Sequence, residues 1–202
     1  MNHPLRCRCG TLRGRVRLPA TTGRAICYCK DCQAYAHFLQ RADDVLDEAG
    51  GTDIVAMAPA QLQIEQGLDH LACMSLSKRG ILRWYASCCN TPIGNTPRDR
   101  KVHYVGLVHN CLSAQPMDAS FGPARVRLNT ESARSRVAST PAALVSVMFT
   151  LMRVLLPAGF GGRYRNNPFF TADGSPLRVP QVPAAAELVR LKEQVAGAGA
   201  AH

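Results

Sequence analysis

The chain has 202 residues, of which 47% are hydrophobic and 19% charged; these values are typical of a globular protein and exclude a disordered one. Its nine cysteines are an odd number and most of them stand in clusters, which argues against a secreted disulfide framework. The start of the chain lacks the apolar segment of a signal peptide, so we expect a cytoplasmic protein whose thiolates bind metal. The net charge of +10 comes mainly from arginine, and it suits a solvated surface, an anionic small-molecule ligand or a nucleic acid.

The first predicted elements are two strands and a short helix. Apolar and charged residues alternate over residues 12–18, which predicts a half-buried strand with arginines on its solvent face. After a turn, residues 24–29 form a second predicted strand. Asp31 is suited to cap a short helix, and we expect Tyr35 and Phe38 of that helix in the core rather than in a ligand site.

The middle of the chain alternates short apolar runs with turn residues. The predicted strands are residues 53–57, 62–65, 70–76, 80–86 and 103–109. We expect Cys73, within one of these strands, to be a small buried hydrophobic residue. Many short strands with regular turns predict a mainly β fold, a sandwich or a tent, and no glycine-rich motif supports a nucleotide cofactor.

The character of the chain changes after about residue 121. Residues 142–156 are strongly apolar and predict a helix that is too short for a bilayer and contains Arg153, so we expect it to be buried or at an interface. Residues 184–195 predict a second, amphipathic helix. We therefore divide the chain into a zinc-binding β domain, residues 1–122, and a C-terminal extension with two helices, residues 123–202.

Three cysteines stand within six residues, with the spacing C-x-C-x-x-C: Cys27, Cys29 and Cys32. Three thiolates at Zn–S distances of about 2.3 Å leave one tetrahedral position open, which is the arrangement of a catalytic zinc. The alternatives are free thiols, buried or reactive, or half of a redox pair. Metal binding is favoured because two further pairs occur in the chain: Cys7 with Cys9, and Cys88 with Cys89.

Together these motifs resemble a known family. The stretch Cys7-Arg8-Cys9-Gly10, the C-x-C-x-x-C triple and an aromatic strand that leads into Cys89-Asn90-Thr91-Pro92 are similar to the glutathione-dependent formaldehyde-activating enzyme / centromere protein V family. The resemblance covers about residues 5–110 and implies an Mss4-like β-tent of short antiparallel strands with zinc sites. It implies that the triple holds a zinc whose open position takes a glutathione thiol.

The resemblance also implies a structural zinc site that includes Cys7, Cys9 and Cys89. The family's downstream motif is C-x-x-C-G, whereas this chain has Ala86 in place of the first cysteine and Asn90 in place of the glycine. Three candidates therefore remain for the fourth ligand of the structural zinc: Cys88, a water molecule and a histidine such as His3. We favour Cys88, which requires a sharp turn because adjacent side chains of an extended strand point apart.

The resemblance implies a carbon–sulfur lyase that handles glutathione adducts of small aldehydes, with zinc as the cofactor and a small thiol as a partner. Lys30 or Arg24 would offset the negative charge at the triple. Tyr35 and His37 are the nearest general acids in sequence, although we expect both to be structural. The alternative is a non-catalytic zinc module that binds an anionic partner such as nucleic acid; no catalytic residue, substrate or oligomeric state follows from the sequence.

Overall fold

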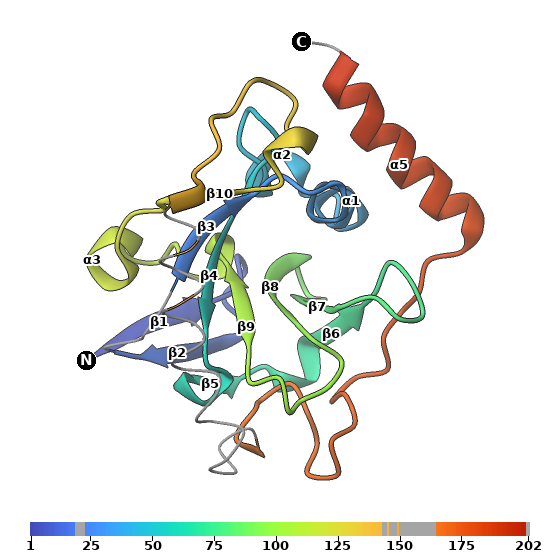
Figure 1. Cartoon of the computed structure of the whole chain (residues 1–202). Helices are drawn as coiled ribbons and strands as arrows, with labels where there is room; N and C mark the ends of the chain where they lie inside the picture. The colour runs from blue at the N-terminus through green and yellow to red at the C-terminus, as the bar shows by residue number, and fades with distance from the viewer. Residues whose placement is uncertain (19–22, 143–144, 146–148, 150–164, 201–202) are drawn as a thin grey trace.

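The computed structural model describes residues 1–18, 23–142, 145, 149 and 165–200 of the chain. In this part of the chain the fold is mainly β, as predicted, with two sheets and a C-terminal helix (Figure 1). The smaller sheet is antiparallel, and its strands in spatial order are β1 (Asn2–Arg6), β2 (Arg13–Arg17) and β5 (Leu62–Gln66).

The larger sheet has seven strands and carries most of the core. In spatial order they are β10 (Val126–Leu128), β3 (Gly23–Cys27), β4 (Thr52–Met57), β9 (Val105–Val108), β8 (Thr91–Thr96), β7 (Leu82–Ala86) and β6 (Leu71–Met74). One pair departs from the predicted antiparallel pattern: β10 runs parallel to β3, with Val126 opposite Ala25.

Strand β2 shows why the alternating pattern was informative. Its arginines are exposed, whereas Gly14 and Val16 are buried against the core, so the predicted solvent face is confirmed. Strand β8 was missed because Pro92, Gly94 and Asn95 have low strand propensity. It lies between β7 and β9, and tertiary packing decides its conformation.

The helices are short except at the C-terminus. They are α1 (Lys30–Phe38), α2 (Ala42–Val45), α3 (Met117–Phe121) and α5 (Ala185–Ala200), with 3-10 turns at Pro59–Gln61, Leu68–His70, His109–Cys111 and Thr130–Ser132. Helix α1 is capped by Cys29, whose sulfur accepts the backbone N–H of Cys32; the predicted cap, Asp31, lies instead in the first turn. Tyr35 is buried and its hydroxyl donates to the carbonyl of Trp84 at 2.9 Å, which confirms its structural role.

The main core surrounds Trp84 of β7, which is fully buried. Phe169 stacks on the indole with ring centroids 5.0 Å apart, and the indole N–H donates to Thr96 at 2.9 Å. Cys73 is buried in the same cluster, as predicted. The sheet and the core thus both include residues beyond 122, and the division into two domains stays a prediction.

Helix α5 lies beside α1 (Figure 1). Leu191 and Val195 of α5 form a buried cluster with Ala34 of α1. The predicted helix over residues 142–156 lies almost entirely outside the described residues. Within the described part of the chain, no helix has the length and apolar character needed to cross a bilayer.

Candidate metal centres

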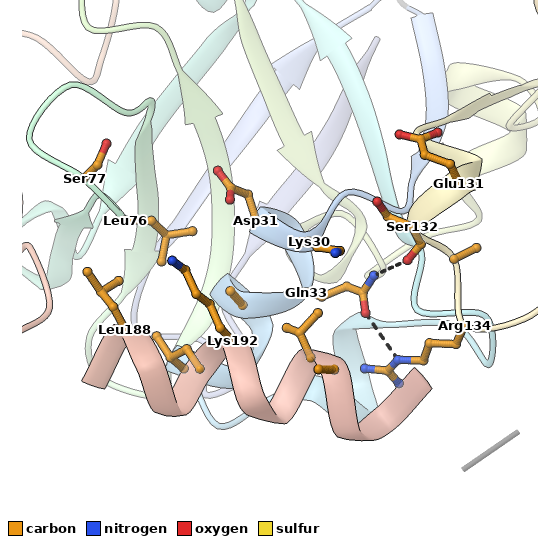
Figure 2. Close-up of a pocket in the computed structure, with 15 residues that line it drawn as sticks. Lys30, Asp31, Gln33, Leu76, Ser77, Glu131, Ser132, Arg134, Leu188 and Lys192 are labelled. Carbon is orange, nitrogen blue, oxygen red and sulfur yellow. Dashed lines mark hydrogen bonds between the residues drawn. The ribbon is translucent and has the colours of Figure 1, made fainter. Parts of the chain in front are cut away.

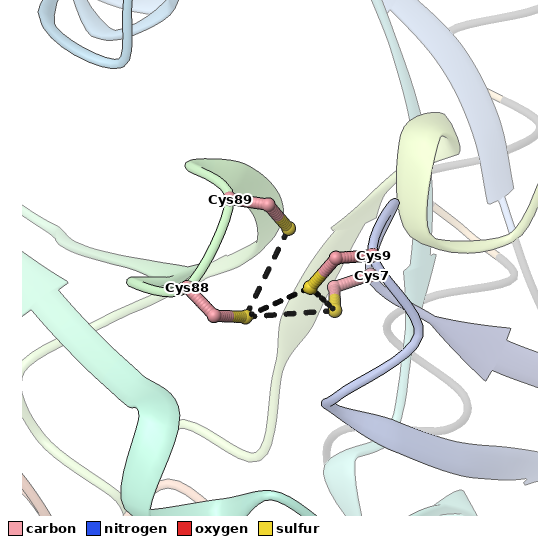
Figure 3. A group of neighbouring side chains, drawn as sticks. All are labelled: Cys7, Cys9, Cys88 and Cys89. Atoms are coloured by element: carbon pink, nitrogen blue, oxygen red, sulfur yellow. Dashed lines mark hydrogen bonds between the residues drawn. The ribbon is translucent and has the colours of Figure 1, made fainter.

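Four sulfurs from two distant parts of the chain converge on one point (Figure 3). This four-cysteine group consists of Cys7, Cys9, Cys88 and Cys89, and its Sγ atoms all lie within 4.8 Å of one another. The Sγ of Cys9 lies 3.3 Å from that of Cys88 and 3.5 Å from that of Cys7. Sulfurs at the corners of a tetrahedron with Zn–S bonds of 2.3 Å are about 3.8 Å apart, so the group fits one metal ion with little adjustment.

The first half of this group is a tight turn between β1 and β2. The backbone N–H of Cys7 donates to the carbonyl of Leu12 at 2.9 Å, and the N–H of Leu12 donates to the sulfur of Cys7 at 3.2 Å. Gly10 has a φ of +79°, a conformation that side chains disfavour, and this allows the turn to close. The C-x-C-G sequence therefore holds two sulfurs on one side of a rigid loop.

The second half is the turn between β7 and β8. The N–H of Cys89 donates to the carbonyl of Ala86 at 3.3 Å, and Asn90 takes a left-handed φ of +53°. Asparagine tolerates this conformation better than most residues. Cys88 and Cys89 consequently lie in a turn and not in an extended strand, and their side chains converge. This is the sharp bend that a fourth thiolate from Cys88 requires.

The alternative ligand His3 is engaged elsewhere. Its Nδ1 lies 2.8 Å from the hydroxyl of Ser120 and its Nε2 lies 2.7 Å from the carbonyl oxygen of Leu112, and the side chain is fully buried. With both ring nitrogens hydrogen-bonded, His3 has no free atom for a metal in this arrangement.

Hydroxyl groups support the exposed sulfurs of the four-cysteine group. The Oγ1 of Thr11 lies 3.2 Å from the sulfur of Cys9, and that of Thr91 lies 3.1 Å from the sulfur of Cys89. The hydrogen bond from the Thr11 hydroxyl, followed by that from the Thr11 backbone, lowers the pKa of Cys9 to about 6. Stabilised thiolates are the form that binds zinc.

A second, three-cysteine group lies where β3 meets α1: Cys27, Cys29 and Cys32, with the three Sγ atoms within 4.8 Å of one another. Cys27 ends β3, Cys29 caps α1 and Cys32 lies in its first turn. The sulfurs of Cys32 and Cys27 are 3.8 Å apart, close to the value expected around zinc. Among the described residues, no fourth Cys, His, Asp or Glu belongs to this group, so a metal held here keeps a position for another ligand.

A buried arginine accompanies the three-cysteine group. Arg83 is 1% exposed, and its Nη1 lies 3.8 Å from the sulfur of Cys32. The same nitrogen donates to the side-chain oxygen of Asn95 at 3.4 Å, while Nη2 lies 3.6 Å from a carboxylate oxygen of Asp31. The guanidinium also lies over the ring of Tyr35, 5.4 Å from its centroid.

The charges of Arg83 and Cys32 stabilise one another. Hydrogen bonds from the thiols of Cys27 and Cys29 contribute most to lowering the pKa of Cys32 well below its usual value, and the charge of Arg83 adds to them. Burial lowers the pKa of Arg83, but the Cys32 thiolate opposes this and the pKa is raised overall. A buried cation is costly without an anion, which points to a negatively charged sulfur site beside it.

Asn129 contacts the three-cysteine group, and the charges of the group act on Tyr104. The sulfur of Cys27 lies 3.8 Å from the side-chain oxygen of Asn129. Burial, followed by the charges of Cys32 and Cys27, raises the pKa of Tyr104 to about 12. The hydroxyl of Tyr104 lies against the backbone of Gly106, where a β-carbon would approach it to 2.8 Å.

Sequence reasoning missed Arg83 and Tyr104 as site residues, although an arginine within the apolar run of β7 was a signal. Arg24, a predicted cation for the three-cysteine group, instead forms ion pairs with Asp53 at 2.7 Å and with Asp118. His37 was one of the nearest general acids in sequence. The charges that act on it are those of Arg134 and Asp43, and not those of the cysteines.

The fold and these two groups define a mainly β protein with two cysteine clusters that fit metal ions. The model of the family of unknown function DUF6151 matches residues 1–178, and the chain belongs to this family. No curated protein matches the chain. A crystal structure of a Rhodobacter sphaeroides protein is similar at 16% identity, with a TM-score of 0.43 over 62% of this chain and 99% of the other. The resemblance to the formaldehyde-activating family and its Mss4-like fold stays a prediction.

Proposed function

We propose that the protein binds two zinc ions, one structural and one with an open position that takes a small thiol, and that it acts as a carbon–sulfur lyase on adducts of a thiol such as glutathione with small aldehydes. The observation that carries this proposal is the three-cysteine group beside buried Arg83. A purely structural site would close its shell with a fourth protein ligand, as the four-cysteine group is able to do.

The four-cysteine group is proposed as the structural site. It joins the turn after β1 to the turn after β7, two segments far apart in the sequence. A metal that closes so long a loop constrains the unfolded chain, and its binding energy adds to the stability of the fold.

The three-cysteine group is proposed as the reactive site. Zinc at this position would lower the pKa of a bound thiol and keep it as the thiolate, the nucleophilic form. Three thiolates and Zn²⁺ carry a net charge of −1, so a fourth thiolate is repelled unless a cation offsets the charge. Arg83 is such a cation, and it is held in place by Asn95 and Asp31.

Tyr104 is proposed as the general acid of this site. When a thiolate attacks an aldehyde, the C–S bond forms, the carbonyl electron pair moves to oxygen, and that oxygen must take a proton. With a pKa of about 12, the hydroxyl of Tyr104 remains protonated at neutral pH and is able to donate it. The reverse reaction returns the proton to Tyr104 as the C–S bond breaks. A cytoplasmic location would keep the thiols reduced.

The test is a glutathione titration of the cobalt-substituted protein, followed by its thiolate-to-metal absorption. We expect a new band that saturates in the parent and is lost in Cys29→Ser, but is retained in Cys73→Ser, a control at a buried cysteine outside both groups. A titration that leaves the parent spectrum unchanged would contradict the open thiol site.

The alternative function is a non-catalytic zinc module that binds an anionic partner such as nucleic acid. The exposed arginines of β2 favour it, but Arg15 is already paired with Glu65 and Arg13 donates to the carbonyl of Gly10. Duplex DNA binding at two salt concentrations tests it, since phosphate contacts give a steep salt dependence. Tight, salt-sensitive binding with no response to glutathione would favour this alternative.

A further inference from the structure

A cavity of about 780 Å³ lies between α1, α5 and the segment that follows β10 (Figure 2). Sites for small molecules commonly have volumes of about 300–1,000 Å³. Helix α5 forms one whole side of this cavity, so the cavity depends on the C-terminal part of the chain.

The floor of the cavity is apolar and preformed. Leu76, Leu188 and Leu191 line it together with Ala34 and Val195. Ala34, Leu191 and Val195 also belong to the buried cluster that packs α5 on α1. Because these side chains are fixed by packing, a hydrocarbon group is able to bind here without reordering the floor.

The rim of the cavity carries three cations: Lys30, Arg134 and Lys192. Among the described residues, neither lysine forms an ion pair. Arg134 donates through Nε to the side-chain oxygen of Gln33 at 3.3 Å, and its Nη2 is buried without a hydrogen-bond partner in the described structure. A buried cationic donor of this kind is costly to leave unpaired.

The two acidic residues of the cavity already have partners. Asp31 lies 3.6 Å from Arg83, and the carboxylate of Glu131 accepts a hydrogen bond from Asn129 at 3.5 Å. The neutral amide of Asn129 leaves the charge of Glu131 in place, so the lining, with three cations and two acids, has a net charge of +1. This positive charge beside an apolar floor is complementary to an anion with a hydrocarbon body.

We propose that this cavity binds an amphipathic carboxylate, with the carboxylate at Arg134 and a medium-length hydrocarbon chain that extends along the leucines toward the end of the cavity at Lys192 (Figure 2). Lys30 and Asp31 stand between Cys29 and Cys32 in the chain, and Asn129 joins Cys27 to Glu131. The cavity thus adjoins the three-cysteine group. If the proposed function holds, the bound hydrocarbon chain is the non-reacting part of the substrate of the three-cysteine group.

The test is calorimetric titration of the zinc-loaded full chain with decanoate. We expect saturable binding of one decanoate per chain, with decylammonium at least tenfold weaker. Arg134→Gln should weaken decanoate about tenfold, and Leu188→Ser about threefold because it removes part of the apolar floor. Arg190→Ala, on the same helix but outside the cavity, is the matched control and should bind like the parent.

The proposal is overturned if decylammonium binds as tightly as decanoate, if Arg134→Gln or Leu188→Ser binds decanoate like Arg190→Ala, or if no saturable binding occurs. Leu188 is only partly buried, so its variant tests the cavity even if Arg134→Gln does not fold. Decanoate binding that persists in Cys29→Ser supports this inference whatever becomes of the metal site. If the protein still responds to glutathione but does not bind decanoate, this inference is overturned and the proposed function is not.

Discussion

Replacing Arg83 with methionine removes a buried cation from beside the three-cysteine group while keeping a side chain of similar length. The Nη1 of Arg83 lies 3.8 Å from the sulfur of Cys32. At an effective dielectric constant of about 20, two unit charges at this distance interact by about 4 kcal/mol. The bound thiolate is a different sulfur from that of Cys32, and the guanidinium spreads its charge over three nitrogens and shares it with Asp31. We therefore take about half of this value, about 2 kcal/mol, as the effect on a fourth thiolate.

That energy corresponds to an affinity for glutathione about 30-fold lower in Arg83→Met than in the parent. Arg83→Lys keeps the charge but lacks the planar group that reaches both Cys32 and Asn95, so its loss should be smaller. The assay is the glutathione titration of the cobalt-substituted protein. Arg17→Met, an exposed arginine of β2, is the control and should bind like the parent. Equal affinities in Arg83→Met and Arg17→Met would refute the role of Arg83 as the compensating charge.

Further predictions concern the structural site and the proton donor. Cys9→Ala should lower the melting temperature of the whole β structure, and a variant that melts like the parent would show that the four-cysteine group is not a structural site. Cys88→Ser should lower zinc affinity and stability nearly as much as Cys89→Ser, because both sulfurs reach the same group; a silent Cys88→Ser would make this residue a bystander. Tyr104→Phe should slow adduct formation by a factor of about 10²–10⁴ while glutathione affinity stays unchanged, and an unaltered rate would exclude Tyr104 as the general acid.

Local patterns explain what the sequence predicts well. The spacing of Cys27, Cys29 and Cys32 brings three sulfurs together within one strand end and one helix turn, without help from the rest of the fold. The alternation along β2 likewise reports one buried face and one exposed face. Because both features depend only on residues close together in the chain, the sequence alone predicts them.

Long-range packing explains what the sequence does not predict. Arg83 contacts Cys32 across 51 positions of the chain, and this contact exists because β7 packs beside α1. The convergence of Cys88 with Cys9 depends on the left-handed backbone of Asn90, which the sequence allows but does not require. Strand β8 contains Pro92, and its neighbours in the sheet override a propensity that argues against a strand.

The central claim is that the chain holds two metal ions of different kinds. Elemental analysis of the purified protein, as zinc per chain, tests it most directly. From the two cysteine groups we predict two equivalents in the parent and one in Cys29→Ser, which should remain folded because the four-cysteine group is intact. Full metal content in folded Cys29→Ser, or one equivalent or less in the parent, would contradict the account.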